Sequence, residues 1–260
     1  MIGVGIDGGS RAIKIVLMDC APGRVLAEGV RDQGVDHDGL ARGLLDDLLK
    51  EANLARSRIG RTVATGYTRG AITLADTTVT EITCHAVGVR RGVPDAATVV
   101  EIGGQDSKLL RLNPDGGVRD FAMNDRCAAG TGRFLEVVAH RLGADLADLG
   151  DLARAATSPA PISSMCVVFA ETEIIGLLAS GAKPEDIVAG VQASIASRVV
   201  AMIGRDAPAP VILTGGVALV PGMSDALAAA LKTPVRLAPD PQMTGALGAA
   251  LLACRQLSRT

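Results

Sequence analysis

Short apolar runs alternate with segments of helical periodicity along the first part of the chain. The runs "IGVGID", "AIKIVLMD" and "RVLAEGV" have the length and side chains of β-strands. Leucines then recur at helical spacing and predict an amphipathic helix over roughly 37–53. "RTVATGY" follows as a further strand and "ITCHAVGVRR" as a helix. This alternation of strands and helices predicts an α/β fold.

The opening pattern returns near residues 97–112. "ATVVEIGGQDSKLLRL" repeats the order of "IGVGIDGGSRAIKIVLM": a strand, an acid, two glycines, a polar tip, a lysine and a strand. An internal repeat of this kind predicts two similar domains. We place them at residues 1–95 and 96–260, and the pattern allows the last helix to pack back on the first domain.

The second half of the chain is mostly helical by its pattern. Helices are expected at about 130–142, 145–156, 167–180, 184–204, 222–231 and 242–256. The strands "VILTGG" and "VRLAP" lie between the last three of these helices.

Composition excludes several classes of function. The chain has 260 residues, of which 48% are hydrophobic, so it can form a core and is not a disordered chain. Aromatic residues make up only 2%, which disfavours base stacking. A net charge of -2 gives no electrostatic reason to bind nucleic acid or a membrane. No apolar run approaches the ~20 residues of a membrane span, and no secretory signal is recognisable. We therefore expect a cytoplasmic protein.

Three glycine pairs follow apolar strands and are candidate phosphate-binding turns. They are Gly8-Gly9, Gly103-Gly104 and Gly215-Gly216. Consecutive backbone N–H groups in such turns form anion-binding nests, and a nearby acid can hold magnesium through water. The spacing matches neither a P-loop nor a dinucleotide fingerprint. Turns that need glycine for geometry alone are the alternative, but the repeat of an acid and a lysine favours phosphate binding.

Two of the five cysteines, Cys127 in "MNDRCAAGTGRFLE" and Cys166 in "CVVFAETEII", stand before expected helices. Helix N-termini stabilise thiolates and anionic clusters. A zinc or iron–sulfur site usually takes four ligands, so two cysteines from each of two chains would complete one site on a twofold axis. We expect Cys20, Cys84 and Cys254 to be structural, and the wide cysteine spacing argues against a disulfide framework.

Taken together, "GIDGGS", "ATGY", "EITCHAVG", "EIGGQDSK", "MNDRCAAGTGRFLE", "CVVFAETEII" and "TGGVA" span nearly the whole chain. In this order they resemble the ATP-dependent activators of 2-hydroxyacyl-CoA dehydratases, which share a family with the ATPase subunits of benzoyl-CoA reductase. The resemblance implies two ribonuclease-H-like domains of the actin, heat-shock chaperone and sugar kinase superfamily.

The resemblance also implies nucleotide-binding residues. It places phosphate loops at residues 7–14 and 102–108 and an adenosine-side loop at 214–218. Residues expected to contact the nucleotide are Gly8, Gly9, Ser10, Arg11, Ala12, Ile13, Lys14, Gly103, Gly104, Gly215, Gly216 and Gln242. Residues expected to act in hydrolysis are Asp7, Glu101, Gln105 and Asp106. Asp7 would hold Mg²⁺ through water, and Gln105 and Asp106 would orient the attacking water.

Cofactors and partners follow from the same resemblance. It implies a homodimer with one 4Fe–4S cluster held by Cys127 and Cys166 of each subunit, with ATP or ADP and Mg²⁺ bound. One low-potential electron, received from a ferredoxin or flavodoxin, would pass to an iron–sulfur dehydratase or reductase component acting on an acyl-CoA.

One position departs from the family pattern, because the second loop usually reads Asp-Ile-Gly-Gly and here begins with Glu101. A carboxylate remains, one methylene longer, so magnesium binding is expected to persist while the hydrolysis rate changes. A small-molecule kinase and a non-catalytic nucleotide switch are the alternative functions. Both would use the glycine loops and leave the two helix-start cysteines without a role.

Overall fold

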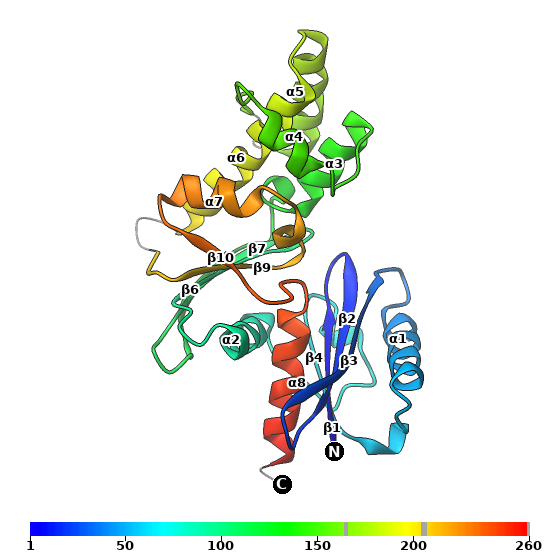
Figure 1. Ribbon diagram of the computed structural model, residues 1–260. Helices are drawn as coiled ribbons and strands as arrows, with labels where there is room; N and C mark the ends of the chain where they lie inside the picture. Colours follow the sequence, from blue (N-terminus) through cyan, green and yellow to red (C-terminus); the bar gives the residue numbers. More distant parts are fainter. Residues whose placement is uncertain (164–165, 204–206, 259–260) are drawn as a thin grey trace. The chain divides into compact units, whose positions relative to one another are not determined.

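The computed structural model describes residues 1–163, 166–203 and 207–258. The chain divides into two compact units. The first unit comprises Met1–Pro94, Asp115–Val118 and Gln242–Thr260, and the second comprises Asp95–Pro114 and Arg119–Pro241. The C-terminal segment therefore belongs to the same unit as the N-terminal strands, and both chain ends lie beside that unit in Figure 1.

The first unit is built on a five-stranded mixed sheet of order β3-β2-β1-β4-β5. Its strands are β1 (Ile2–Gly8), β2 (Ala12–Asp19), β3 (Arg24–Asp32), β4 (Ile59–Thr65) and β5 (Thr77–Thr78). Its helices are α1 (His37–Glu51), α2 (Glu81–Gly92) and α8 (Thr244–Leu257), with short 3-10 turns η1 (Arg56–Arg58) and η2 (Arg69–Ala71). The first three strands are antiparallel, and β4 runs parallel to β1.

The alternation within β1 explains the layers of this unit. Ile2, Val4 and Ile6 point to one face and share a core cluster with the leucines of α1. Gly3 and Gly5 point to the other face, where a Cβ on Gly5 would lie 2.0 Å from the carbonyl oxygen of Ala246 on α8. The glycines thus let α8 lie directly on the sheet, and Figure 1 shows α1 and α8 on opposite sides of these strands.

The second unit repeats this topology with more helices. Its sheet has the order β8-β7-β6-β9-β10. The strands are β6 (Thr98–Ile102), β7 (Ser107–Leu112), β8 (Val118–Asn124), β9 (Val211–Thr214) and β10 (Val235–Leu237). The helices are α3 (Gly132–Leu142), α4 (Leu149–Ala155), α5 (Val167–Ala179), α6 (Pro184–Ile203) and α7 (Met223–Leu231), with 3-10 turns η3 (Ala128–Gly130) and η4 (Gly216–Leu219).

One hydrophobic cluster forms the core of the second unit. It joins residues of β6, β7 and β9 to apolar side chains of α3, α5, α6 and α7, including the fully buried Phe134 of α3. Helix α6 contributes Ile187, Val188, Val191 and Ile195, which lie at helical spacing along one face of the helix. No helix within the described ranges is long and apolar enough to cross a bilayer.

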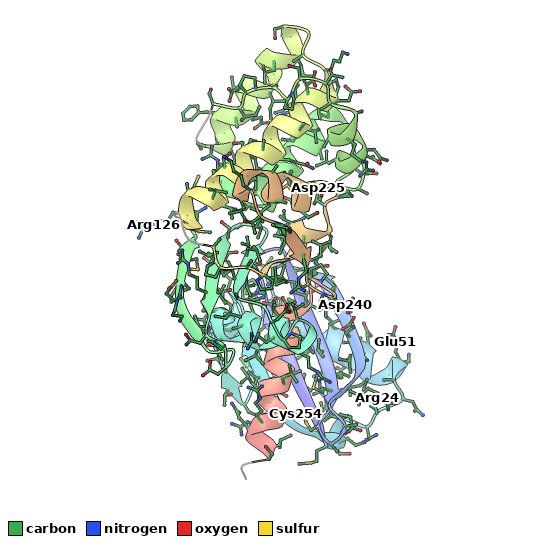
Figure 2. All side chains as sticks on the ribbon, turned by 60° about the vertical axis from the view of Figure 1, so that its left-hand side comes forward. Arg24, Glu51, Arg126, Asp225, Asp240 and Cys254 are labelled. Atoms are coloured by element: carbon green, nitrogen blue, oxygen red, sulfur yellow. A yellow bond between two sulfur atoms is a disulfide. The ribbon has the colours of Figure 1, made fainter. Side chains whose placement is uncertain are left out.

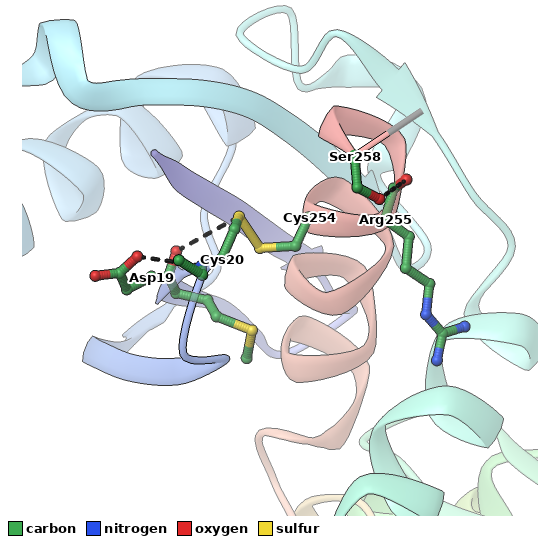
Figure 3. Close-up of a disulfide and its surroundings, with 7 residues drawn as sticks. Asp19, Cys20, Cys254, Arg255 and Ser258 are labelled. Carbon is green, nitrogen blue, oxygen red and sulfur yellow. Dashed lines mark hydrogen bonds between the residues drawn. A yellow bond between two sulfur atoms is a disulfide. The ribbon is translucent and has the colours of Figure 1, made fainter. Parts of the chain in front are cut away.

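The cysteine spacing proved misleading at one pair, because Cys20 and Cys254 form a disulfide (Figure 3). Cys20 lies in the turn after β2, and Cys254 lies on α8, where their Cα atoms are 5.2 Å apart. A Cβ on Gly3 would lie 2.6 Å from the Cys254 sulfur and 3.2 Å from that of Cys20, so the glycine makes room for the bond. The partners are 234 positions apart, which the sequence pattern alone does not connect.

Candidate functional site

The first predicted phosphate loop joins β1 to β2 and carries a cross-strand ion pair at its base. Asp7 and Lys14 are register partners in the antiparallel ladder. Lys14 Nζ donates to Asp7 Oδ2 at 3.1 Å, and both side chains are largely buried. The N–H of Gly9 donates to the Ala12 carbonyl at 3.1 Å and closes the hairpin. Ser10 is half-buried at the tip, and Arg11 is exposed.

Two residues hold this loop from outside the hairpin. Thr68 donates its backbone N–H to the Gly8 carbonyl at 2.8 Å, and Gln33 Nε2 donates to the Gly9 carbonyl at 2.9 Å. Because a peptide is planar and trans, fixing the Gly9 carbonyl toward Gln33 turns the Ser10 N–H the opposite way. The loop therefore has a defined peptide orientation, as an anion-binding turn requires.

The second phosphate loop, between β6 and β7, carries a more deeply buried charge cluster. Glu101 and Lys108 are register partners, and Lys108 Nζ lies 2.8 Å from Glu101 Oε2 and 2.8 Å from Asp106 Oδ2. The Lys108 side chain is only 2% exposed. The N–H of Gly103 donates to the Asp106 carbonyl at 2.9 Å. One lysine thus holds two carboxylates beside the loop, which leaves a net negative charge there.

The pairing shows how the two loops correspond. Asp7 faces Lys14 as Glu101 faces Lys108, so a constant offset of 94 positions (101 − 7 and 108 − 14) relates the two hairpins. Glu101 therefore takes the place of Asp7, although its distance from the glycine pair differs in the sequence. Under the same offset Gly9 corresponds to Gly103, and both close their loops with the same backbone hydrogen bond.

The turn after β9 packs directly against the second loop. Gly215 has φ +90°, and a Cβ there would lie 2.4 Å from the Ile102 carbonyl oxygen and 2.7 Å from Glu101 Oε1. Its N–H donates to the Pro241 carbonyl at 2.9 Å, as does Thr214 Oγ1 at 2.7 Å. Only glycine fits this position. The structure thus brings the predicted loop at 214–218 beside the acid of the second phosphate loop.

A matching turn in the first unit is absent from the set of site residues predicted from the sequence. Gly66, after β4, has φ +87°, and a Cβ there would lie 2.3 Å from Asp7 Oδ1 and 2.6 Å from the Gly8 carbonyl oxygen. Each unit therefore has a Thr-Gly turn against its acid. The repeated dipeptide, Thr65-Gly66 and Thr214-Gly215, is the sequence signal that could have revealed it.

The other predicted nucleotide residues lie in varied surroundings. Ala12 and Ile13 are buried on β2, so only their backbone atoms are available to a ligand. Gln105 is exposed at the tip of the second loop. A Cβ on Gly216 would meet no atom within 4 Å, so this glycine borders open space. Gln242 is half-buried in the turn before α8, in the first unit.

Cys127 is held in place through its backbone. It precedes η3, and its N–H donates to Asn124 Oδ1 at 3.1 Å while Asn124 Nδ2 donates to its carbonyl at 2.7 Å. The side chain is half-buried and forms no disulfide. The neighbouring Arg126 points outward from the second unit (Figure 2). The backbone of Cys127 is therefore fixed by hydrogen bonds, while its side chain remains partly accessible.

Cys166 stands at the N-cap position of α5 and is exposed. Its carbonyl accepts the first helical hydrogen bond, from Ala170 N at 2.8 Å. The next helical residues include Val168 and Phe169, which are 68% and 69% exposed. An exposed thiol thus lies beside large apolar side chains that the described part of this chain leaves exposed.

The remaining cysteines do not offer a free accessible thiol. Burial raises the pKa of Cys84 to about 12, so this thiol stays protonated near neutrality. Cys20 and Cys254 are bonded to each other. In the described part of the chain no three or more His, Cys, Asp or Glu side chains gather to hold a metal. One chain thus supplies two available thiols, which fits half of a four-thiolate cluster and not a complete one.

Comparisons with known proteins identify relatives that match this chain over nearly its full length. The chain is 46% identical over 254 residues to the activator of lactoyl-CoA dehydratase from Anaerotignum propionicum, covering 97% of each. A solved structure of the activator of 2-hydroxyisocaproyl-CoA dehydratase from Clostridium difficile, with bound ADPNP, matches with a TM-score of 0.94 and 40% identity. That match covers 100% of this chain and 96% of the other.

A more distant structure shows the fold alone. A ROK hexokinase from Thermus thermophilus matches all of this chain with a TM-score of 0.52 at 17% identity, and the match covers 100% of that chain. The predicted fold class, paired ribonuclease-H-like domains of the actin and sugar kinase superfamily, is confirmed. The sequence profile of one ATPase family matches residues 4–253. Because that match covers nearly the whole chain, this chain belongs to the BadF/BadG/BcrA/BcrD ATPase family.

Proposed function

We propose that this protein is an ATP-dependent reductive activator. It couples ATP hydrolysis to the transfer of one low-potential electron to a partner iron–sulfur enzyme that acts on an acyl-CoA. The observation that carries the proposal is the pair of available thiols, Cys127 and Cys166, in the same unit as the second phosphate loop. A kinase or a simple nucleotide switch has no use for these thiols.

ATP and Mg²⁺ bind through the two acid–lysine hairpins in this proposal. Asp7 holds Mg²⁺ through the water ligands of the ion, a mode that magnesium favours because it dehydrates reluctantly. Lys14 pairs with Asp7 and orients its carboxylate, and Lys108 does the same for Glu101 and Asp106. Gln105, exposed at the loop tip, is free to orient the attacking water.

A 4Fe–4S cluster is held by Cys127 and Cys166 from each of two identical chains. Support comes from the thiol count of one chain and from the uncovered Val168 and Phe169 beside Cys166. Exposed apolar side chains of this size mark protein interfaces, and a second copy is the occupant that also completes the ligand set. When bound, the cluster supplies one-electron redox chemistry.

The size of the change in reduction potential explains why ATP would be coupled to electron transfer. For a one-electron couple, about 59 mV corresponds to a factor of ten. A large drop in potential thus needs several kcal/mol of difference between two conformations, which nucleotide binding and hydrolysis can supply. Hydrogen bonds to sulfur and solvent access tune such potentials, and both change if η3 or α5 shifts at its first residue.

A 2-hydroxyacyl-CoA dehydratase is the partner that we favour, because activators of such enzymes are among the most similar relatives. A benzoyl-CoA-reductase-type enzyme is the alternative, since one component of the benzoyl-CoA reductase from Thauera aromatica is 30% identical to this chain. A ferredoxin or flavodoxin would supply the electron. The two candidates can be distinguished by testing which purified component, the dehydratase or the reductase, this protein reduces in the presence of ATP.

Iron loading tests the proposal. After anaerobic reconstitution with iron and sulfide, Cys127→Ser and Cys166→Ser should each lose the iron and the brown visible absorbance. The matched controls Cys20→Ser, Cys84→Ser and Cys254→Ser should keep about two irons per chain, which is one 4Fe–4S cluster per dimer. Equal iron in all five variants would overturn the shared cluster. Full phosphoryl transfer to a sugar by iron-free protein would favour the kinase alternative.

A further inference from the structure

The start of α3 is hydrogen-bonded to the second phosphate loop. Gly132 donates its N–H to the Gly103 carbonyl at 2.9 Å, and Arg133 donates to the Gly104 carbonyl at 2.9 Å. These N–H groups are among the first of the helix, which have no partner within it. The loop therefore satisfies donors of the same helix that follows Cys127 and η3.

Thr131 adds a side-chain link at the same junction. This residue is fully buried. Its Oγ1 lies 3.1 Å from the Gly104 carbonyl oxygen and 2.7 Å from the Ala128 carbonyl oxygen. A hydroxyl carries one proton, so it donates to one of the two carbonyls at a time. One acceptor belongs to the phosphate loop, and the other belongs to the residue directly after Cys127.

The other end of this link is equally well defined. Ala128 begins η3, and Cys127 is fixed to Asn124 by two hydrogen bonds. A shift of the Ala128 peptide therefore moves the Cys127 carbonyl within a closed hydrogen-bonded turn. A continuous connection runs from Gly104 through Thr131 and Ala128 to Cys127. This connection is distinct from the polypeptide chain itself, which runs from the second loop through β7 and β8 to Cys127.

We infer that Thr131 is a positioning residue that transmits the state of the second phosphate loop to Cys127. The inference rests on the proposed function, because it assumes that this loop binds the phosphates of ATP. With the Gly103 and Gly104 carbonyls turned toward α3, the N–H groups of Gly104 and Gln105 point to the opposite side. A phosphate held there fixes these peptides. Its loss lets them rotate and changes which carbonyl receives the Thr131 proton.

Thr131→Val tests this with little risk to folding. The change keeps the side-chain shape and removes the hydroxyl. Neither carbonyl is orphaned, because Gly104 still accepts from Arg133 N and Ala128 still accepts from Thr131 N. Thr131→Ser restores the hydroxyl. Thr98→Val is the matched control, since Thr98 Oγ1 makes a comparable bond to the Pro208 carbonyl at 2.7 Å elsewhere in the same unit.

The measurement uses reduced, cluster-free protein, so that it does not depend on iron. We would follow alkylation of Cys127 by mass spectrometry at one fixed pH, with Mg²⁺ and either a non-hydrolysable ATP analogue or ADP. A buried hydrogen bond contributes about 1 kcal/mol, which corresponds to roughly a fivefold change in a rate. We therefore expect the Cys127 alkylation rates with the two nucleotides to differ by about fivefold in wild type, Thr131→Ser and Thr98→Val. In Thr131→Val the ratio should fall to near one, while nucleotide affinity stays close to that of wild type.

Other results would reject the inference. An unchanged ratio in Thr131→Val would show that the signal does not pass through Thr131. Equal rates with both nucleotides in wild type, at saturating occupancy, would remove the coupling while leaving ATP binding intact. Failure of wild type to bind nucleotide at all would instead contradict the proposed function. If Thr131→Val did not fold, hydrogen exchange at the Gly132 and Arg133 amides of wild type would decide: equal protection with both nucleotides would reject the inference, and different protection would support it.

Discussion

At the scale of single residues, chemical role follows from surroundings more than from residue type. The three cysteines outside the disulfide illustrate this, because Cys84 is buried on α2 while Cys127 and Cys166 directly precede helical turns. The sequence predicted the positions of the latter two before helices from the small polar loop and from the helix start, and their role as ligands stays a prediction. It could not show the Asn124 bonds that fix Cys127, since an asparagine before a turn has many possible partners.

Thiol reactivity should separate these cysteines. We expect iodoacetamide to modify Cys127 and Cys166 in the folded, cluster-free protein near neutral pH. Cys84 should stay unmodified, because burial raises its pKa to about 12 and leaves almost no thiolate. Peptide mapping after a short reaction measures this. Modification of Cys84 at a rate similar to that of Cys166 would show that α2 does not shield it.

The acid of the first loop should be needed for hydrolysis and not for the cluster. Asp7→Asn keeps the shape beside Lys14 and removes the charge that would hold Mg²⁺ through water, so Mg²⁺-dependent ATPase activity should fall by about 100-fold or more. Iron content should be unchanged. Asp46→Asn, which removes an exposed ion pair with Arg56, is the control and should keep full activity. Normal hydrolysis in Asp7→Asn would show that the magnesium assignment is wrong.

At the scale of elements, the first unit depends on helices that approach other backbone very closely. A Cβ on Gly248 of α8 would lie 1.8 Å from the Cys84 carbonyl oxygen, and one on Gly88 of α2 would lie 1.9 Å from the Thr244 carbonyl oxygen. Periodicity predicted both helices. It did not predict this contact, because the spacing of small residues in α8 is compatible with several partners.

Alanine at Gly248 tests the contact. Gly248→Ala should destabilise the protein by about 1–3 kcal/mol, because added volume forces α2 and α8 apart. Gly176→Ala on α5 is the matched control, since a Cβ there meets no atom within 4 Å. That change should be neutral or stabilising by up to ~1 kcal/mol through helix propensity. Urea unfolding measures both, and equal midpoints would contradict the close packing.

The exposed start of α5 should hold two copies together. Phe169→Asp places a charge on a 69% exposed apolar side chain beside Cys166, so it should convert the proposed dimer to a monomer and prevent cluster assembly. Val35→Asp, at a fully exposed valine of the first unit, should have no effect. Light scattering after size-exclusion chromatography gives the mass. A stable Phe169→Asp dimer would place the interface elsewhere.

At the scale of the whole molecule, the chain is two versions of one topology. The repeat of strand, acid, glycines, lysine and strand was visible in the sequence, and the register of both hairpins bears it out. Contacts between distant segments were not visible. Gly66 was missed because it is a single glycine, and the Cys20–Cys254 bond was missed because its partners lie near opposite ends of the chain.

That bond should contribute to stability and not to iron binding. Cys254→Ser should lower the free energy of unfolding by about 2–4 kcal/mol, the usual effect of removing a cross-link that closes a long loop. The double variant with Cys20→Ser should match the single one, because both remove the same bond. Thermal unfolding without reductant measures the loss. Full stability in Cys254→Ser, or a loss of iron, would contradict this assignment.

The division of the chain also sets the order in which the protein can be completed during synthesis. The first unit needs both its opening strands and α8, which ends at Leu257, whereas the second unit ends at Pro241. Domains generally fold as their residues leave the ribosome, the earlier one first. In this chain the second unit has all of its residues before the first unit does. The second unit is complete in sequence at Pro241, and β1 must wait for α8 to cover its glycine face.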